Sequence, residues 1–292
     1  MAEKTEDPKK QKTRRLLLAT AAAVVVAGAV VVFMDEGGDV VVVVEGPSPV
    51  NPNKPKGDPF PEAKATATIK GRVVFVGGEF PKPDPEKVPI SGEAHCEQAH
   101  PELPASENVV IDPATKGIGN VIVWVESETL ASFVYPEAAK WFELDQKDCL
   151  YRPHVSCVIT RQPIRVKNGD PIGHNVNYFS PAGLNAGANP DQPTGVDIPI
   201  KDGFARRDVM RFKCDKHTWM GAWMGVVPHR FFDVTDADGT FELPKILVGS
   251  GKWTIRAWWE PRSSEAKPTE ASVEVTVEEG KTYTIEIPMN LD

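Results

Sequence analysis

Short apolar runs that end at glycines or at turn signals recur along the chain after residue 65. The runs are 68–78, 109–126, 156–170, 252–260, 271–280 and 281–289. In the last three, apolar and polar residues alternate with a period of two, as they do in half-buried β-strands. Strands separated by turns predict an all-β sandwich or barrel.

Two segments add detail to this prediction. Residues 133–144, FVYPEAAKWFEL, are the one stretch of the body with helical character, and they are short. Residues 230–243 place Asp238-Gly239 between apolar runs, and an Asp-Gly pair favours a tight hairpin turn. We therefore expect a hairpin at 230–243 and little helix in the folded body.

An uncharged apolar run of 19 residues, 16–34, precedes the β-rich part, and basic residues lie just before it. Its length suits one transmembrane helix, and basic residues stay on the cytoplasmic side of a membrane. We therefore expect residues 1–15 to be a cytoplasmic tail and residues 16–34 to be a single-pass anchor in the inner (cytoplasmic) membrane. The body would then lie on the periplasmic, extracytoplasmic side.

A cleaved signal peptide is the alternative interpretation of the same run. Ala27-Gly28-Ala29 has the small-x-small form of a cleavage site, and TRRLLL loosely resembles a twin-arginine export signal. The apolar run continues past Ala29, which favours an uncleaved anchor. Both interpretations export the rest of the chain.

Residues 35–65 are predicted to be a linker because prolines are dense there. Proline at that density disfavours a helix or a central strand and favours an extended spacer. The folded body would begin near Thr66, at some distance from the membrane.

The chain of 292 residues has a net charge of -8, which argues against nucleic acid as a partner, because phosphate requires a basic surface. An acidic exported body would attract a basic soluble partner by electrostatic steering. Acidity that serves only solubility is the other interpretation.

The stretch KCDKHTWM, residues 213–220, places Cys214, His217 and Met220 three residues apart, and His174 lies forty residues before Cys214. One thiolate, two imidazoles and a weak thioether are the ligand set of a blue-copper site. Residues 210–213 and 223–227 are predicted strands, so a short loop between them would present three ligands to one point. This pattern predicts a copper site.

Three other interpretations of these residues are weaker. A zinc site would use Cys and His, but methionine is a poor zinc ligand, and structural zinc prefers four Cys or His ligands. A binuclear copper site needs two bridging cysteines, and this loop holds one. A chance cluster would combine a buried Cys, a surface His and a core Met without any metal.

The motifs HNV at 174–176 and C-x2-H-x2-M at 214–220 resemble those of the cupredoxins, the plastocyanin- and amicyanin-like blue copper proteins. The loop spacing is most similar to that of amicyanin, although no proline lies beside His217 or Cys214. A wider resemblance, over about residues 66–290, is to bacterial membrane-anchored proteins in which a cupredoxin is joined to a carboxypeptidase-regulatory-like β-sandwich.

This resemblance implies a cupredoxin Greek-key sandwich at 66–229 and the second, smaller β-sandwich at 230–292. Residues 66–90 are candidates for pairing with 230–290, which would make them part of the second sandwich. The resemblance also implies one type 1 copper, with His174, Cys214 and His217 in a plane and Met220 as the axial ligand. Asn175 would tie the two ligand loops together by hydrogen bonds.

Trp219, directly before Met220, has two interpretations. It packs in the core beside a dry metal site, or it belongs to a hydrophobic patch around His217 through which an electron enters or leaves.

Two histidines, His95 and His100, flank Cys96. A second metal site is conceivable there, but a polar loop with incidental histidines is the interpretation that we favour.

Three cysteines remain if Cys214 binds copper, and export permits a disulfide between two of them. We expect Cys96–Cys149, because Cys157 lies inside an apparent strand and suits a buried thiol. Cys96–Cys157 is the alternative, since the sequence does not settle connectivity.

The expected function is that of a membrane-tethered carrier of single electrons and not of an enzyme. We identify no nucleophile–base pair, and the sequence has no C-x-x-C-H haem-attachment motif. A c-type cytochrome or a membrane oxidoreductase is the expected redox partner, within a larger complex or free. The alternatives are copper delivery or storage, and a structural β-sandwich subunit without a redox role.

Overall fold

The computed structural model describes residues 30–34, 40–44, 57–83, 85–247, 252–262 and 266–291. The chain divides into two units, Met1–Lys54 and Pro55–Asp292. In the first unit, strand β1 (Val30–Met34) pairs antiparallel with β2 (Val40–Val44). Both strands are rich in valine, whose branched side chain favours extended backbone.

The predicted transmembrane segment, 16–34, is only partly covered by the described residues. Residues 16–29 lie outside them, and the helix expected for Val30–Met34 is wrong because these residues form β1. Among the described residues, no helix has the length and apolar character needed to cross a membrane. The predicted linker, 35–65, contains β2 and the short 3-10 helix η1 (Glu62–Lys64).

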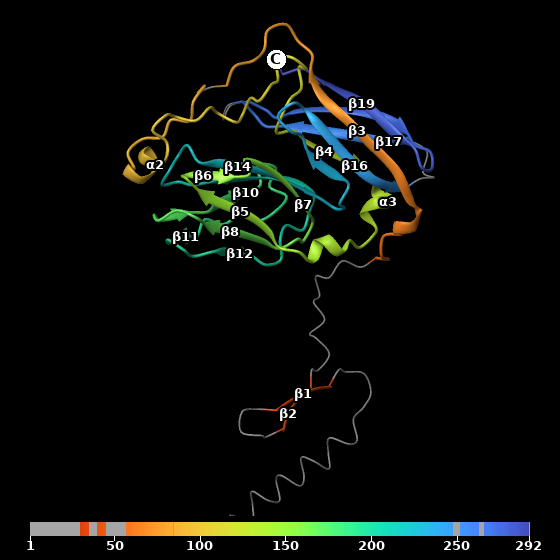
Figure 1. Ribbon diagram of the computed structural model, residues 1–292, viewed down its shortest axis with the longest axis horizontal. Helices are drawn as coiled ribbons and strands as arrows, with labels where there is room; N and C mark the ends of the chain where they lie inside the picture. Colours follow the sequence, from red (N-terminus) through yellow and green to blue (C-terminus); the bar gives the residue numbers. More distant parts are fainter. Residues whose placement is uncertain are drawn as a thin grey trace, which may run out of the picture. The chain divides into compact units, whose positions relative to one another are not determined.

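Residues 142–227 form a sandwich of two four-stranded sheets, which we call the central sandwich (Figure 1). One sheet has the order β10 (Asn177–Phe179), β13 (Asp208–Lys213), β14 (Gly221–Val227), β7 (Val155–Ile159). The other has the order β12 (Ile198–Ile200), β8 (Ile164–Asn168), β5 (Phe142–Lys147), β6 (Leu150–Arg152). Leu144 and Val166 of one sheet and Phe212 and Met224 of the other are fully buried in one cluster, so the sheets face each other.

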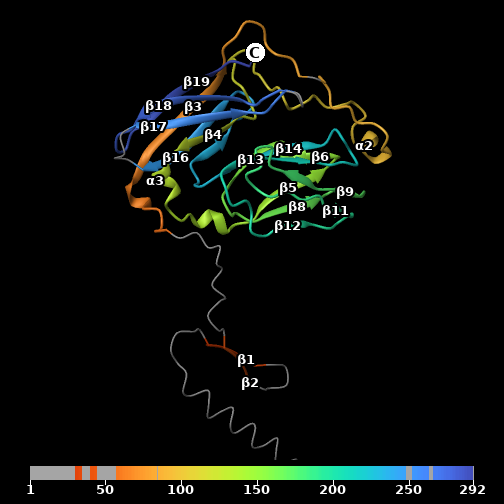
Figure 2. The same ribbon diagram turned by 180° about the vertical axis from the view of Figure 1, so that it is seen from behind.

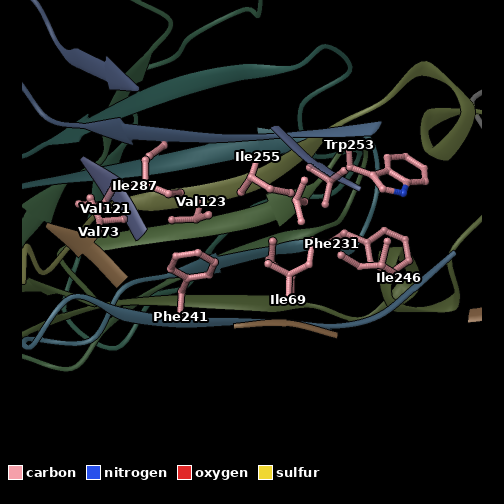
Figure 3. Close-up of a cluster of buried hydrophobic side chains, with 14 of the residues drawn as sticks. Ile69, Val73, Val121, Val123, Phe231, Phe241, Ile246, Trp253, Ile255 and Ile287 are labelled. Carbon is pink, nitrogen blue, oxygen red and sulfur yellow. The ribbon is translucent and has the colours of Figure 1, made fainter. Parts of the chain in front are cut away.

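A second sandwich, which we call the outer sandwich, has a four-stranded and a three-stranded sheet. The first has the order β15 (Phe232–Val234), β4 (Ile122–Glu126), β17 (Lys252–Trp259), β18 (Thr269–Thr276). The second has the order β16 (Thr240–Leu247), β3 (Ala65–Phe75), β19 (Thr282–Met289). Figure 3 shows the core between them, where Ile69 and Phe241 lie with Val123 and Ile255. The structure is therefore all-β, as predicted.

Strand pairing divides the chain differently from the predicted boundaries at 66–229 and 230–292. β3 pairs with β16 and β19, as expected for residues 66–90, and β4 pairs with β15 and β17, so both belong to the outer sandwich. The central sandwich is thus inserted between β4 and β15. The hairpin expected at 230–243 is also wrong, because β15 and β16 belong to different sheets and the turn at Gly239 (φ +82°) connects them.

The two sandwiches contact each other through a third apolar layer. It contains Ile122, Trp124 and Trp258 of the outer sandwich, and Val155, Cys157 and Val227 of the central one. β4 is consequently buried on both faces, with Val123 and Val125 in the outer core, which explains its continuous apolar sequence. Beside this layer lies a cleft of about 1010 Å³, which extends to Thr218 and Trp219 in the loop between β13 and β14.

The described helices are short: η1, α2 (Ala94–Ala99), α3 (Glu128–Ala131) and η2 (Pro136–Ala139). The helical character at 133–144 corresponds to η2, after which the chain enters β5. α2 belongs to an irregular segment, 85–108, which we call the strap, and it lies at the end of the central sandwich beyond β6 (Figures 1 and 2). Ile90 and Cys96 of the strap are buried in the central core.

The predicted disulfide between Cys96 and Cys149 is present, and it joins α2 to the turn between β5 and β6. Cys157 is a free, buried thiol in β7, in the apolar layer between the sandwiches. The preference for this pairing over Cys96–Cys157 is therefore confirmed.

Candidate metal centre

The ligand loop connects β13 to β14 at one end of the central sandwich. The predicted strands at 210–213 and 223–227 are both present, within β13 and β14. The amide of Cys214 donates to the carbonyl of Met220 (3.3 Å), and the amide of Met220 donates to the carbonyl of His217 (2.8 Å). These bonds close residues 214–220 into a tight loop, in which the side chains of Cys214, His217 and Met220 are buried.

Three predicted ligand atoms converge at this loop. His174 lies on the two-residue strand β9 (His174–Asn175), which pairs with β11 (Asp191–Gln192). Its Nδ1 is 2.9 Å from Nδ1 of His217, and Sγ of Cys214 is 3.8 Å from the first nitrogen and 3.7 Å from the second. One ion can therefore lie at bonding distance, roughly 2.0–2.3 Å, from all three atoms at once.

All of the predicted ligands are buried. The exposed fractions are 0% for His174, 1% for Cys214, 5% for His217 and 1% for Met220. Met220 lies in the same core cluster as Cys214, and its backbone is bonded to both loop ligands. One thiol, two imidazoles and one thioether form a donor set that suits copper better than zinc.

The second nitrogen of His174 is held by a residue that the sequence analysis missed. Nε2 of His174 lies 2.9 Å from Oδ2 of Asp170, whose side chain is 2% exposed. A carboxylate accepts, so this bond places the ring proton on Nε2 and leaves Nδ1 free to bind a metal. In the sequence, Asp170 belongs to the turn signal Asn168-Gly169-Asp170 that ends the run 156–170, and only its position four residues before His174 could have indicated this role.

Asp170 remains a carboxylate despite its burial. Burial would raise its pKa, but hydrogen bonds from His174 and from the amides of Cys149 and Asp148 outweigh this effect and lower it. The carboxylate therefore supplies a fixed negative charge behind the imidazole of His174.

The two imidazoles differ in their affinity for a proton. Burial would lower the pKa of His174, but its hydrogen bonds with Asp170 and Cys214 raise it. For His217, burial and then the charge of His174 lower the pKa. The surroundings therefore shift the pKa values of the two imidazoles in opposite directions.

Cys214 and Cys157 are both buried free thiols, yet their pKa values shift in opposite directions. Burial raises the pKa of Cys157. Burial acts in the same sense on Cys214, but hydrogen bonding by His174 and by backbone groups of the ligand loops outweighs it and lowers the pKa. Deprotonation to the thiolate, the form that binds metals, is therefore easier at Cys214 than at Cys157.

Asn175 connects the two ligand segments. Its Oδ1 accepts from the amides of Asp215 (2.8 Å) and Lys216 (3.3 Å), and the thiol of Cys214 lies 3.3 Å from the same oxygen. Its Nδ2 donates to Oδ2 of Asp215 (3.3 Å) and to Oδ1 of Asn189. The strand that carries His174 is thereby tied to the start of the 214–220 loop.

The indole of Trp219 packs on the imidazole of His217, and this imidazole is buried. Its ring centroid is 5.3 Å from that of His217, and its Nε1 donates to the carbonyl of Cys149 (3.1 Å). His217 is 5% exposed, so its imidazole does not present the open edge that the patch interpretation requires. Trp219 itself is half-buried and borders the cleft between the sandwiches.

A second group of potential ligand atoms comprises His95, Cys149 and Asp170. The sulfur of Cys149 is bonded to Cys96, so it cannot act as a thiolate ligand. His100, on the other side of Cys96, has Nε2 at 2.6 Å from the carbonyl of Asp148. The hydrogen bond of His100 favours a structural role for that residue, and the disulfide removes the thiolate that a site at His95 would need.

No protein-family model and no curated protein sequence matches the chain. Solved structures that are similar to it include a purple cupredoxin from Nitrosopumilus maritimus, with 17% identity over 29% of this chain and 97% of that one, at a TM-score of 0.25. A Cu(I) methionine-to-alanine mutant of amicyanin has 17% identity over 36% of this chain and 97% of its own, at a TM-score of 0.27. The oxidized form of a proline-to-alanine mutant of amicyanin has 18% identity with the same coverages and TM-score.

Proposed function

We propose that this chain is a type 1 (blue) copper protein that carries single electrons between redox partners. The observation that supports this is the buried triangle of His174 Nδ1, His217 Nδ1 and Cys214 Sγ, with Met220 at the end of the same loop. Copper in such a site supplies a reversible Cu(II)/Cu(I) couple. His174, His217 and Cys214 would hold the copper, with Met220 as a further, weaker ligand.

The surroundings suit an electron carrier because they fix the ligands before a metal arrives. Asp170 orients His174, and Asn175 fixes the start of the ligand loop. The apolar core that encloses Cys214 and Met220 excludes water. A rigid, dry site changes little between oxidation states, which favours fast electron transfer over exchange of the metal.

Trp219 is the proposed route for the electron, because the imidazole of His217 is buried and the indole packs on it. The proposed partner is a c-type cytochrome or a membrane oxidoreductase, and the net charge of -8 favours one with a basic surface. We further propose that the apolar run before β1 tethers the protein to the membrane, with its body in the extracytoplasmic space. The disulfide Cys96–Cys149 suits such an oxidising compartment.

The test is the visible absorption and EPR spectrum of the full chain loaded with Cu(II), compared with Cys214→Ser and with Cys157→Ser. Cys157 is the matched control, because it is also a buried free thiol but lies between the sandwiches. We expect an intense blue band and narrow copper hyperfine splitting that only Cys214→Ser abolishes. A pale spectrum with wide splitting, unchanged in Cys214→Ser, would reject the proposal and favour copper delivery or storage.

A further inference from the structure

The turn between β5 and β6 has an unusual backbone for its sequence. Lys147 pairs with Leu150, so the turn consists of Asp148 and Cys149 alone. Both residues have positive φ, +53° and +57°, which defines a type I′ turn. Such turns favour Asn-Gly, because a side chain disfavours left-handed backbone. Two non-glycine residues keep this conformation only where their surroundings impose it.

Every backbone polar group of this turn is held by a side chain from elsewhere in the fold. The amides of Asp148 and Cys149 donate to Asp170, at 2.6 and 2.9 Å. The carbonyl of Asp148 accepts from Nε2 of His100 (2.6 Å), and the carbonyl of Cys149 accepts from Nε1 of Trp219 (3.1 Å). The disulfide adds a covalent bond from Cys149 to Cys96 in α2.

Two of these contacts lead directly to the two imidazoles of the metal centre. Oδ2 of Asp170 receives both the amide of Cys149 and Nε2 of His174. The indole of Trp219, anchored at the carbonyl of Cys149, packs on the ring of His217. The backbone of one residue, Cys149, therefore connects the supports of both histidines.

We propose that the turn Asp148–Cys149, locked by the disulfide to Cys96, is the positioning element for both imidazoles. The disulfide keeps Cys149 in left-handed backbone, and this conformation directs its N–H to Asp170 and its C=O to Trp219. When the disulfide is absent, the turn relaxes, Asp170 and Trp219 lose their anchors, and the rings of His174 and His217 reorient. The effect on a bound copper rests on the proposed function, whereas the effect on the rings does not.

The decisive comparison is between Cys96→Ala, the double variant Cys96→Ala with Cys149→Gly, and Cys157→Ala, all in the full chain. Cys96→Ala removes the disulfide but leaves a side chain on residue 149. The double variant also lacks the disulfide, but glycine adopts positive φ without strain. Cys157→Ala controls for the loss of a buried sulfur remote from the turn.

The first readout is the ring ¹⁵N shifts and Nε2-proton exchange of His174 in the metal-free, ¹⁵N-histidine-labelled protein. We expect wild type and Cys157→Ala to share a protected Nε2–H, Cys96→Ala to lose that protection at least tenfold, and the double variant to recover most of it. The second readout is the copper hyperfine splitting in EPR, expected to widen in Cys96→Ala and to return towards the wild-type value in the double variant.

Identical His174 shifts and exchange in wild type and Cys96→Ala would overturn the proposal, and so would a double variant as perturbed as Cys96→Ala. If Cys96→Ala does not fold, the double variant alone decides: a protected Nε2–H supports positioning by the turn, and an exposed one rejects it. If the wild type binds no copper, the proposed function fails, yet the metal-free comparison still decides this inference.

Discussion

The Nε2 atom of His174 lies 2.9 Å from Oδ2 of Asp170, while Nδ1 on the other side of the ring faces His217 and Cys214. The carboxylate is 2% exposed and cannot donate at neutral pH, since its pKa is lowered. One hydrogen bond thus selects the tautomer that can bind a metal.

We expect Asp170→Asn to weaken copper binding by about 10- to 100-fold, which is the usual cost of removing such a hydrogen bond behind a histidine ligand. An amide N–H directed at Nε2 would favour the opposite tautomer, with the proton on Nδ1 where the metal must bind. Competition titration with a chelator of known affinity measures the change.

Asp202→Asn is the control for this experiment, because Asp202 is an exposed carboxylate in the loop after β12 and its removal alters net charge equally. If Asp170→Asn and Asp202→Asn bind copper with the same affinity, the orienting role of Asp170 is wrong.

Stability should fall below neutral pH because of His229, which is 1% exposed. Its Nε2 donates to the carbonyl of Val125 (2.8 Å), and its Nδ1 accepts from the amide of Phe231 (3.3 Å), so a second ring proton has no acceptor. Burial lowers the pKa of His229 to about 4. The unfolded chain, with a pKa near 6.5, therefore takes up the proton first as pH falls.

Between pH 6.5 and 4, the unfolded state binds more protons than the folded state. By linkage, the free energy of unfolding therefore decreases as pH falls through this range. The difference between the pKa values of His229 in the unfolded and folded states corresponds to a loss of up to about 3 kcal/mol in the free energy of unfolding. Urea denaturation at pH 7 and pH 4.5 measures it. His229→Gln, whose amide can donate and accept in the same way, should remove most of this pH dependence; an unchanged slope would contradict the assignment.

A buried ion pair at the edge of the cleft provides a third prediction. Glu260, 4% exposed, accepts from Nε1 of Trp223 (2.9 Å) and from Nε2 of His154 (2.5 Å). Burial would lower the pKa of His154, but the hydrogen bond and charge of Glu260 raise it. The stabilisation from this pair is therefore present below the unfolded pKa of about 6.5 and is lost as pH rises through the higher folded value.

Glu260→Gln should lower the pKa of His154 and reduce the free energy of unfolding near pH 6 by about 1–3 kcal/mol, because a buried hydrogen-bonding partner loses its charge. NMR titration of the His154 ring and urea denaturation at pH 6 and pH 9 measure the two effects. Glu270→Gln, at a half-exposed carboxylate on β18 near the same cleft, is the control. Equal pKa values for His154 in the two variants would refute the prediction.

Much of the site could be predicted from sequence because its chemistry is local. Cys214, His217 and Met220 belong to one seven-residue loop, and the strands on either side of it have clear apolar patterns. Asp170 was missed because a carboxylate in an NGD turn has no pattern of its own, and its role appears only when β9 places His174 beside it.

The fold was predicted incorrectly in places because strand pairing, like the role of Asp170, depends on tertiary contacts. Apolar runs that end at turn signals identify β3 and β4 as strands, but such runs contain no information on which sheet a strand joins. Both strands pair with strands more than a hundred residues later. The valine run at 30–34 fits an apolar helix by hydropathy, whereas its β-branched side chains also fit the strand that forms. Cys149 is not a residue type that turns favour, so its positive φ, which tertiary contacts hold, had no signal in the sequence.

Copper should stabilise the folded chain in proportion to its affinity, because the triangle of ligand atoms exists only in the folded state. An ion that binds the folded form alone adds about 4 kcal/mol to the free energy of unfolding when its concentration is 1,000 times its Kd. Urea denaturation with and without Cu(II), under conditions that keep the disulfide intact, measures this increment.

Cys214→Ser should lose most of this copper-dependent increment, since a neutral hydroxyl replaces the thiolate, whereas Cys157→Ser should keep it. Because Cys157→Ser also introduces a hydroxyl at a buried position, each variant must be compared with its own metal-free form. An increment that survives in Cys214→Ser would mean that copper binds elsewhere, and the triangle of His174, His217 and Cys214 would then not be the metal centre.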